Sequence, residues 1–343
     1  EITTRLVGSE MCIRDRLYAE FSSCMPSPMA YRCAARILYD NTDRPLRNIL
    51  ILAPLSGDIR GITSQEPREG TAIALQDDEI HAVKGAMNSN DFAGFMDDYV
   101  NPAQLNTANM QVGLGILPVN NEKEAFAMVE KIKKYLDYTN HSYTLNEFLS
   151  VGGVGDSHTH DKQAIKLTEL IETLSGGNSI CSTLAIDAYG KERGRTKMID
   201  YINSGKNLGI YIGHGSSVML GKECFFSSGD IFKLRNTTLP FMIFAACDIT
   251  NFDRGQRGLG EELVVSIPYG LIGSLLSTRS SWSGQNMDMV TSFFTNLYSA
   301  NLSPQPGVAP TIGEVYAVTK TKSTYKNELA YHCLLYTSDA ADD

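Results

Sequence analysis

The second half of the sequence alternates short apolar runs with longer segments of helical periodicity. The runs at 208–212 and 241–246 are apolar at nearly every position, which is typical of strands that are buried on both faces. The segment at 161–174 repeats apolar residues every three or four positions, as an amphipathic helix does. Alternating strands and helices fold into a largely parallel sheet with helices on both faces. We therefore predict an α/β fold of the doubly wound type, with the functional site at the carboxyl ends of the strands.

The same alternation can be followed along most of the chain. The predicted strands are 48–53, 112–119, 147–151, 180–186, 208–212, 241–246 and 271–276. The predicted helices are 30–39, 121–136, 161–174, 195–203, 230–234, 258–265, 286–298 and 312–321. Asn121 and Glu124 have the spacing of a capping box at the start of one of these helices. Poor periodicity over 55–108 indicates long loops with short elements.

A polar break at 137–144 predicts two adjacent α/β subdomains, 17–140 and 141–332. The terminal stretches 1–16 and 333–343 differ from the rest because they resemble translated sequencing adapters, so we expect them to be foreign. Frayed natural termini are the alternative. On this interpretation the first subdomain lacks its start and the second lacks its end. The missing signal peptide then says nothing about secretion.

Charge and cysteine content exclude several classes of function. The net charge is -9 over 343 residues, and it is -6 without the terminal stretches, which hold three basic and six acidic residues. Nucleic-acid binding is therefore not expected, because it rests on clustered Lys and Arg. No apolar run approaches the ~18 residues of a membrane span. Five of the seven cysteines lie within 17–332, and their spacing fits neither a zinc motif nor a disulfide framework.

Two predicted strands end in chemically reactive turns. The strand at 208–212 leads into His214, which lies between two glycines, and the strand at 241–246 leads into Cys247. In a parallel sheet both turns lie on one edge, so the two side chains can meet. A nearby imidazole favours the thiolate and later protonates a leaving amine, as nucleophilic catalysis by cysteine requires. A core cysteine and a turn histidine are the structural alternatives.

These segments resemble a known family. The run Gly213-His214-Gly215-Ser216, followed by 239–241 and Ala246-Cys247, is similar to the catalytic segments of the gingipain family of cysteine peptidases. The closer resemblance is to sortases of the PorU type, from the type IX secretion system. It extends to segments at 17–23, 36–40, 91–98, 113–119, 251–253, 260–263 and 277–279. The resemblance implies a caspase-like α/β fold with mostly parallel sheets.

The resemblance also implies roles and partners. Cys247 is expected to be the nucleophile and His214 the general acid and base, with the N–H groups of Gly215 and Cys247 forming the oxyanion hole. A sortase of this kind removes C-terminal sorting domains from secreted cargo proteins and transfers the cargo to an amine of lipopolysaccharide. It works at the outer-membrane cell surface with other attachment proteins. A gingipain-like protease that only hydrolyses and a non-catalytic caspase-like scaffold are the alternatives.

Four further residues are candidates for the site. Asp156 and His160 follow the strand at 147–151, and they are expected to orient His214 or line the substrate groove; a polar surface loop is the alternative. Trp282 and Arg279 are expected at the specificity pocket by the same resemblance, with a core tryptophan and a surface ion pair as alternatives.

No cofactor is expected to be required. The spacing His158-Thr159-His160 could suggest a metal pair, but no third ligand is placed by spacing, so we expect no catalytic metal. The acidic segments 77–79 and 97–98 are candidates for structural calcium, with solvated acidic loops as the alternative.

Overall fold

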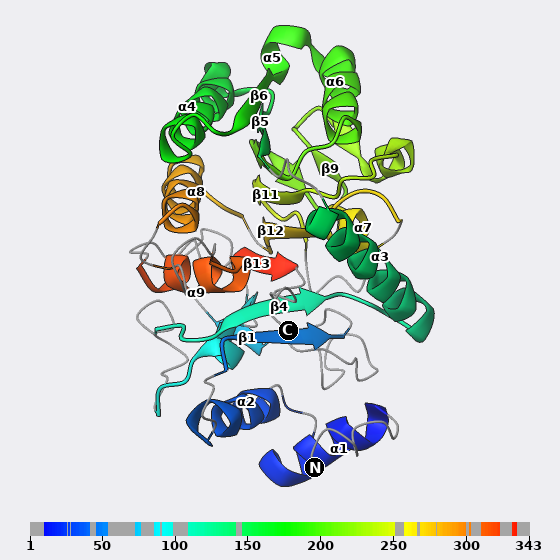
Figure 1. Ribbon diagram of the computed structural model, residues 1–343, viewed down its shortest axis with the longest axis vertical. Helices are drawn as coiled ribbons and strands as arrows, with labels where there is room; N and C mark the ends of the chain where they lie inside the picture. Colours follow the sequence, from blue (N-terminus) through cyan, green and yellow to red (C-terminus); the bar gives the residue numbers. More distant parts are fainter. Residues whose placement is uncertain are drawn as a thin grey trace.

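The computed structural model in Figure 1 describes most of the chain. The residues it describes are 10–25, 27, 29–41, 46–53, 73–76, 86–89, 91–98, 109–141, 146–250, 257–265, 268–278, 280–299, 302, 310–322 and 331–334.

A six-stranded sheet forms the centre of the molecule. Its order is β13-β12-β11-β7-β5-β6, and every neighbouring pair is parallel except β12 with β13. The strands are β5 (Glu147–Gly152), β6 (Ile180–Ala185), β7 (Leu208–Ile212), β11 (Phe241–Ala245), β12 (Gly273–Ser277) and β13 (Tyr331–Leu334). The inner strands β7 and β11 are buried almost throughout, which is why their sequences are continuously apolar rather than alternating.

Helices cover both faces of this sheet, as expected for a doubly wound fold (Figure 1). One face carries α4 (Thr159–Leu174) and α8 (Ser283–Leu297), and α9 (Ile312–Lys322) packs beside α8. The other face carries α6 (Lys191–Asn203) and α7 (Leu259–Val265), and α3 (Glu122–His141) packs against α7. A short helix, α5 (Ile186–Tyr189), follows β6, and a 3₁₀ segment, η4 (Ser228–Lys233), precedes β11. The predicted α/β, mostly parallel and caspase-like fold is confirmed.

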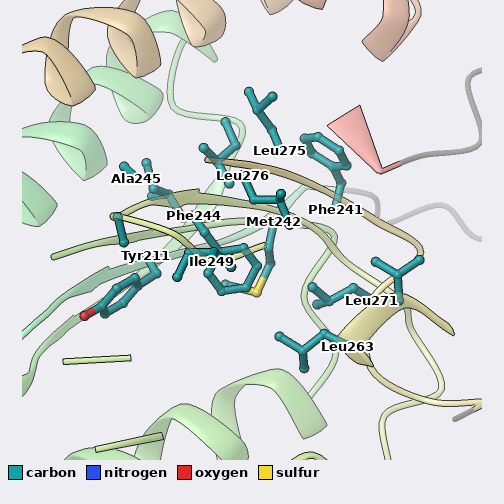
Figure 2. Packing of buried hydrophobic residues seen from close by; sticks show 14 of the residues in the cluster. Tyr211, Phe241, Met242, Phe244, Ala245, Ile249, Leu263, Leu271, Leu275 and Leu276 are labelled. Atoms are coloured by element: carbon teal, nitrogen blue, oxygen red, sulfur yellow. The ribbon is translucent and has the colours of Figure 1, made fainter. Parts of the chain in front are cut away.

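The core lies between the sheet and these helices. Figure 2 shows aromatic and aliphatic side chains of β7, β11 and β12 interlocked with those of α7, among them Tyr211, Phe244, Leu263 and Leu276. All four are essentially inaccessible to solvent. Burial of a side chain of this size contributes roughly 1.5–3 kcal/mol to stability, so the strands beneath the predicted site are among the most firmly held parts of the molecule.

A smaller layer precedes the main sheet. It contains α1 (Glu10–Phe21), α2 (Met29–Asn41), the 3₁₀ segment η1 (Asp91–Gly94), the parallel pair β1 (Asn48–Leu52) with β4 (Gly113–Leu117), and the antiparallel pair β2 (Ile73–Gln76) with β3 (Ala86–Ser89). Strand β4 leads into α3, where the predicted cap is confirmed: Glu124 N–H donates to Asn121 Oδ1 at 3.0 Å. The Glu124 carboxylate accepts from Asn120 N–H, one residue earlier than a capping box requires.

Helix α9 joins the smaller layer to the rest of the molecule. It packs against β4 on one side and α8 on the other. Lys320 Nζ lies 2.7 Å from the buried carboxylate of Asp91, and the Thr321 hydroxyl accepts from Met110 N–H at 2.9 Å. Arg47 Nε donates to Glu314 Oε1 at 2.7 Å. These contacts connect residues more than two hundred positions apart, and they hold the two layers together.

Several elements lie outside the sequence-based prediction. A small antiparallel sheet of β8 (Gly215–Ser216), β9 (Met219–Leu220) and β10 (Phe226–Ser227) follows β7 directly. Strand β13 includes Cys333 and Leu334, which belong to the stretch expected to be foreign. The origin of the terminal stretches stays a prediction. None of the described helices has the length and apolar character needed to cross a bilayer.

Candidate active site

The register of two central strands brings His214 and Cys247 to the same edge of the sheet. Strands β7 and β11 are parallel, with Ile212 opposite Ala245, and each candidate residue lies two positions beyond its strand's last paired residue. Gly213 N–H donates to the Ala245 carbonyl at 3.2 Å, so the pairing continues one step past the strand ends. The two turns therefore emerge side by side, as the sequence predicts.

Close backbone approach explains the glycine that follows the histidine. A Cβ atom at Gly215 would lie 2.5 Å from Ile249 Cδ1, 3.0 Å from Ala246 Cβ and 3.2 Å from the Cys247 carbonyl oxygen. Carbon atoms do not approach this closely, so only glycine fits without a shift of the neighbouring chain. The backbone of Gly215 thus lies against the segment that carries Cys247.

His214 is held from both its backbone and its ring. Its carbonyl oxygen accepts from the buried Tyr211 hydroxyl at 2.7 Å and from Gly221 N–H at 2.8 Å. Its Nε2 lies 3.0 Å from Oδ2 of Asp156, and its ring packs edge-to-face on His160 with centroids 5.3 Å apart. The ring is therefore fixed in one orientation while part of its surface stays open to solvent.

Asp156 lies in the loop that follows β5, the strand next to β7. The close contact with His214 is the main cause that lowers the pKa of the Asp156 carboxyl, and the charge of Lys222 adds to it. Asp156, Ser157 and His158 all have left-handed backbone angles, with φ of 51°, 54° and 62°. Three consecutive non-glycine residues in this region are costly, at about 1–3 kcal/mol each, and such strain clusters at functional sites.

His160 links this loop to the other side of the candidate site. It is only 2% exposed, and its Nε2 lies 3.3 Å from the same Asp156 oxygen that faces His214. Its Nδ1 lies 3.1 Å from Oε1 of Gln163, whose amide nitrogen donates to the Ser283 carbonyl at 3.3 Å and to its hydroxyl at 3.0 Å. Nothing in the sequence pattern points to Gln163, because its partner Ser283 lies on a different helix.

Cys247 contacts the segment that follows β12. Its Sγ accepts from Ser281 N–H at 3.3 Å, and its thiol donates to the Ser281 carbonyl oxygen at 3.4 Å. The Ser281 hydroxyl is in turn held by the amide of Asn286 at 3.0 Å. Ser281 was not singled out in the sequence, although it adjoins Trp282.

The remaining predicted residues have different outcomes. Trp282 is 58% exposed and follows Ser281 directly, so its ring lies at the surface beside the Cys247 segment rather than in the core. Arg279 lies outside the described residues. The side chains of Asp156 and His160 both face His214, which places them with the candidate site and not in a detached surface loop.

The candidate metal ligands divide into two groups. His158 and His160 do not converge on one point: His160 groups with Asp156 and His214, whereas His158 groups with Asp161 and Asp187. Segment 77–79 lies outside the described residues. In segment 97–98, Asp98 pairs with Arg36 at 2.9 Å and Asp97 accepts from the Gln111 amide at 2.8 Å. Structural calcium stays a prediction.

Comparison with known proteins identifies the family. The model of peptidase family C25 matches residues 9–339. The Arg-specific cysteine proteinase gingipain R is 16% identical with a TM-score of 0.65, over 94% of this chain and 72% of that chain. The complex of RgpB pro- and mature domains from Porphyromonas gingivalis is 15% identical with a TM-score of 0.64, over 91% and 68%. At such identities these structures show a common fold alone.

Two further comparisons are weaker. The dimeric latent PorU from Porphyromonas gingivalis is 16% identical over 43% of this chain and 15% of that chain, with a TM-score of 0.28, a value that does not indicate a common fold. No curated protein matches the sequence. The family assignment therefore rests on the C25 match, which spans nearly the whole chain. This chain belongs to peptidase family C25, the gingipain family of cysteine peptidases.

Proposed function

We propose that the chain cleaves peptide bonds through a dyad of Cys247 and His214. Family membership supports the cysteine peptidase chemistry. The observation that supports these two residues is the register of β7 and β11, which end two positions before His214 and Cys247 respectively. The Cys247 sulfur accepts the N–H of Ser281, and the backbone of Cys247 lies against Gly215, the residue after His214.

The chemistry follows from these positions. The Cys247 thiolate attacks the scissile carbonyl carbon, and the negative charge that forms on the oxygen is met by the N–H groups of Gly215 and Cys247. As the C–N bond breaks, His214 gives its proton to the leaving amine, and a thioester remains on Cys247. Water or an amine then attacks the thioester and transfers a proton to His214, so the enzyme returns to its starting state.

Asp156 supports this cycle without touching the substrate. Its contact with Nε2 of His214 leaves Nδ1 as the nitrogen that exchanges protons with sulfur and with the leaving amine. Its charge stabilises the imidazolium that forms when His214 is protonated. The strained loop and the buried His160 keep Asp156 at the required place.

For the biological reaction, we propose a sortase of the type IX secretion system. The support is the sequence resemblance, which extends from segment 17–23 to segment 277–279. Such an enzyme removes the C-terminal sorting domain of a cargo protein and transfers the cargo to an amine of lipopolysaccharide. The implied location is the outer-membrane cell surface, and the implied partners are outer-membrane attachment proteins. Trp282, and Arg279 nearby in the sequence, are proposed for the pocket that selects the cargo.

A thiol-directed peptidyl acyloxymethyl ketone tests the dyad. We expect the probe to label the chain at a single residue, and Cys247→Ala to abolish the labelling. Cys24→Ala is the matched control, because Cys24 is an exposed free thiol on the amino-terminal layer. Labelling that survives Cys247→Ala, or that is lost in Cys24→Ala, contradicts the assignment of the nucleophile.

Mass spectrometry of a cleaved cargo protein tests the acceptor. In the presence of an amine acceptor, a sortase yields cargo whose new C-terminus carries the amine. A free carboxylate on every product would instead identify a protease that only hydrolyses. Absence of both products from a chain that the probe still labels would mean that the dyad is reactive but the cargo assignment is wrong.

A further inference from the structure

Three side chains beside the candidate active site form a second cluster. His158 ends the 3₁₀ segment η3 (Asp156–His158), Asp161 lies in the first turn of α4, and Asp187 lies in α5 after β6. One potential ligand atom from each residue lies within 4.8 Å of the others. The cluster therefore lies at the carboxyl ends of β5 and β6, one strand away from His214.

The distances within the cluster fit a shared ion better than direct hydrogen bonds. Nδ1 of His158 makes a long hydrogen bond of 3.4 Å with Oδ2 of Asp161 and lies 3.4 Å from Oδ2 of Asp187. A hydrogen bond between charged groups is usually about 2.7–2.9 Å long. By contrast, ligands about 2.0–2.1 Å from a tetrahedral metal lie about 3.3–3.4 Å from one another. Both separations from His158 have this second value.

The carboxylates are short of positive partners. Asp161 is 6% exposed, and its Oδ1 has no hydrogen-bond partner among the described residues. Within the same part of the chain, neither Asp161 nor Asp187 pairs with a lysine or arginine. Asp187 accepts the N–H of Gly155 on both oxygens at 3.3 Å. A buried carboxylate needs a compensating charge. The His158 side chain is 65% exposed, so an ion can reach the cluster from solvent on that side.

We propose that His158, Asp161 and Asp187 bind one divalent transition-metal ion of the zinc type. One imidazole nitrogen and two carboxylate oxygens suit Zn²⁺, and water completes the fourth position. Calcium and magnesium prefer oxygen ligands alone, so the imidazole selects against them. The ion joins the loop of Asp156 to α5, and it holds the left-handed backbone of residues 156–158 in place. This site is separate from the thiol chemistry proposed above.

Isothermal titration calorimetry with Zn²⁺ tests the site, using the full chain with Cys247→Ala so that the thiol cannot bind metal. We expect one Zn²⁺ per chain and a higher melting temperature with the ion, and an excess of Ca²⁺ should not displace the zinc. In this background His158→Ala and Asp187→Asn should each weaken zinc binding at least about 100-fold. Replacing a residue that only holds a metal ligand in place already costs about 10–100-fold in affinity, and loss of a ligand itself should cost more. His158 is exposed, so its replacement leaves the fold intact, which circular dichroism verifies.

A matched variant separates this site from the neighbouring group of Asp156, His160 and His214. His160→Gln removes the buried imidazole of that group and leaves His158 in place, so zinc binding should persist. Binding that is lost in His160→Gln but retained in His158→Ala would place the ion on the catalytic group and overturn the proposal. The absence of zinc binding in the Cys247→Ala chain, or binding that survives both His158→Ala and Asp187→Asn, would overturn it as well.

Discussion

Nε2 of His214 lies 3.0 Å from Oδ2 of Asp156. The two residues follow adjacent strands, β7 and β5, so the contact is set by the sheet and not by a local turn. Because this contact lowers the pKa of Asp156, the carboxylate is ionised at neutral pH and can stabilise a protonated His214. The relationship gives the proposed dyad a third, orienting member.

Replacement of Asp156 should therefore slow the reaction strongly. Asp156→Asn keeps the size of the side chain but removes the charge that stabilises the imidazolium, and comparable changes lower kcat on the order of 10³–10⁴-fold. Steady-state kinetics measures the loss. Asp200→Asn is the control, because Asp200 is an exposed carboxylate on α6. If the two variants have equal kcat, Asp156 does not orient the histidine.

Trp282 should affect substrate use more than stability. Its ring is 58% exposed beside the Cys247 segment, so Trp282→Ala loses little buried area in the free protein. We expect kcat/KM for a peptide substrate to fall at least about tenfold, while the melting temperature changes by less than about 2 °C. Phe232→Ala is the matched control, because Phe232 is 65% exposed on η4. A large fall in melting temperature for Trp282→Ala would assign the ring a structural role instead.

Glu261 should make the protein less stable as pH rises from about 4.5 to 7. Burial raises the pKa of its carboxyl to about 7 in the folded chain, although the Thr250 hydroxyl and Gly258 N–H donate to it. The folded state then holds a proton that the unfolded state releases, so the folded state loses stability as pH rises through this window. Urea unfolding at a series of pH values measures the slope, and Glu261→Gln should remove it.

Lys131 should act in the opposite direction between about pH 7 and 10. Its ammonium is buried beneath α7 and donates to the carbonyls of Val264 and Tyr269 at 2.6 and 2.8 Å, and burial lowers its pKa to about 7. The unfolded state now holds the extra proton, so stability increases with pH until the normal lysine pKa is reached. The maximum slope for one group is about 1.4 kcal/mol per pH unit. Lys131→Met should remove this dependence of the free energy of unfolding on pH. An unchanged slope in the variant would mean that the ammonium stays charged in the folded protein.

Much of the fold could be predicted because the strands of the main sheet are buried on both faces. Strand 208–212 was predicted with the observed bounds, and 241–246 is one residue too long, because nearly every residue in these runs is apolar. Helix boundaries were less accurate. Helix α4 begins at Thr159 rather than 161, since the preceding turn is left-handed and has no periodic signal.

The candidate site could be predicted only where topology decides it. The proximity of His214 and Cys247 follows from parallel strands, which end on one edge. The bridge from His160 through Gln163 to Ser283 depends on how α4 lies against α8, and sequence spacing carries no such information. The approach of Asp187 to His158 could not be predicted either. It depends on the pairing of β5 with β6, and the sequences of the two strands do not specify which strands become neighbours.

The contact between α9 and the amino-terminal layer has a consequence for the order in which the chain folds during synthesis. Asp91 is buried, and two groups that hold its carboxylate, Tyr316 and Lys320, follow it by 225 and 229 positions. At about 5–20 residues per second, the ribosome takes roughly 10–45 s to cover that distance. The amino-terminal layer therefore emerges before the six-stranded sheet but completes its packing later, after strands β5 to β12 have left the ribosome.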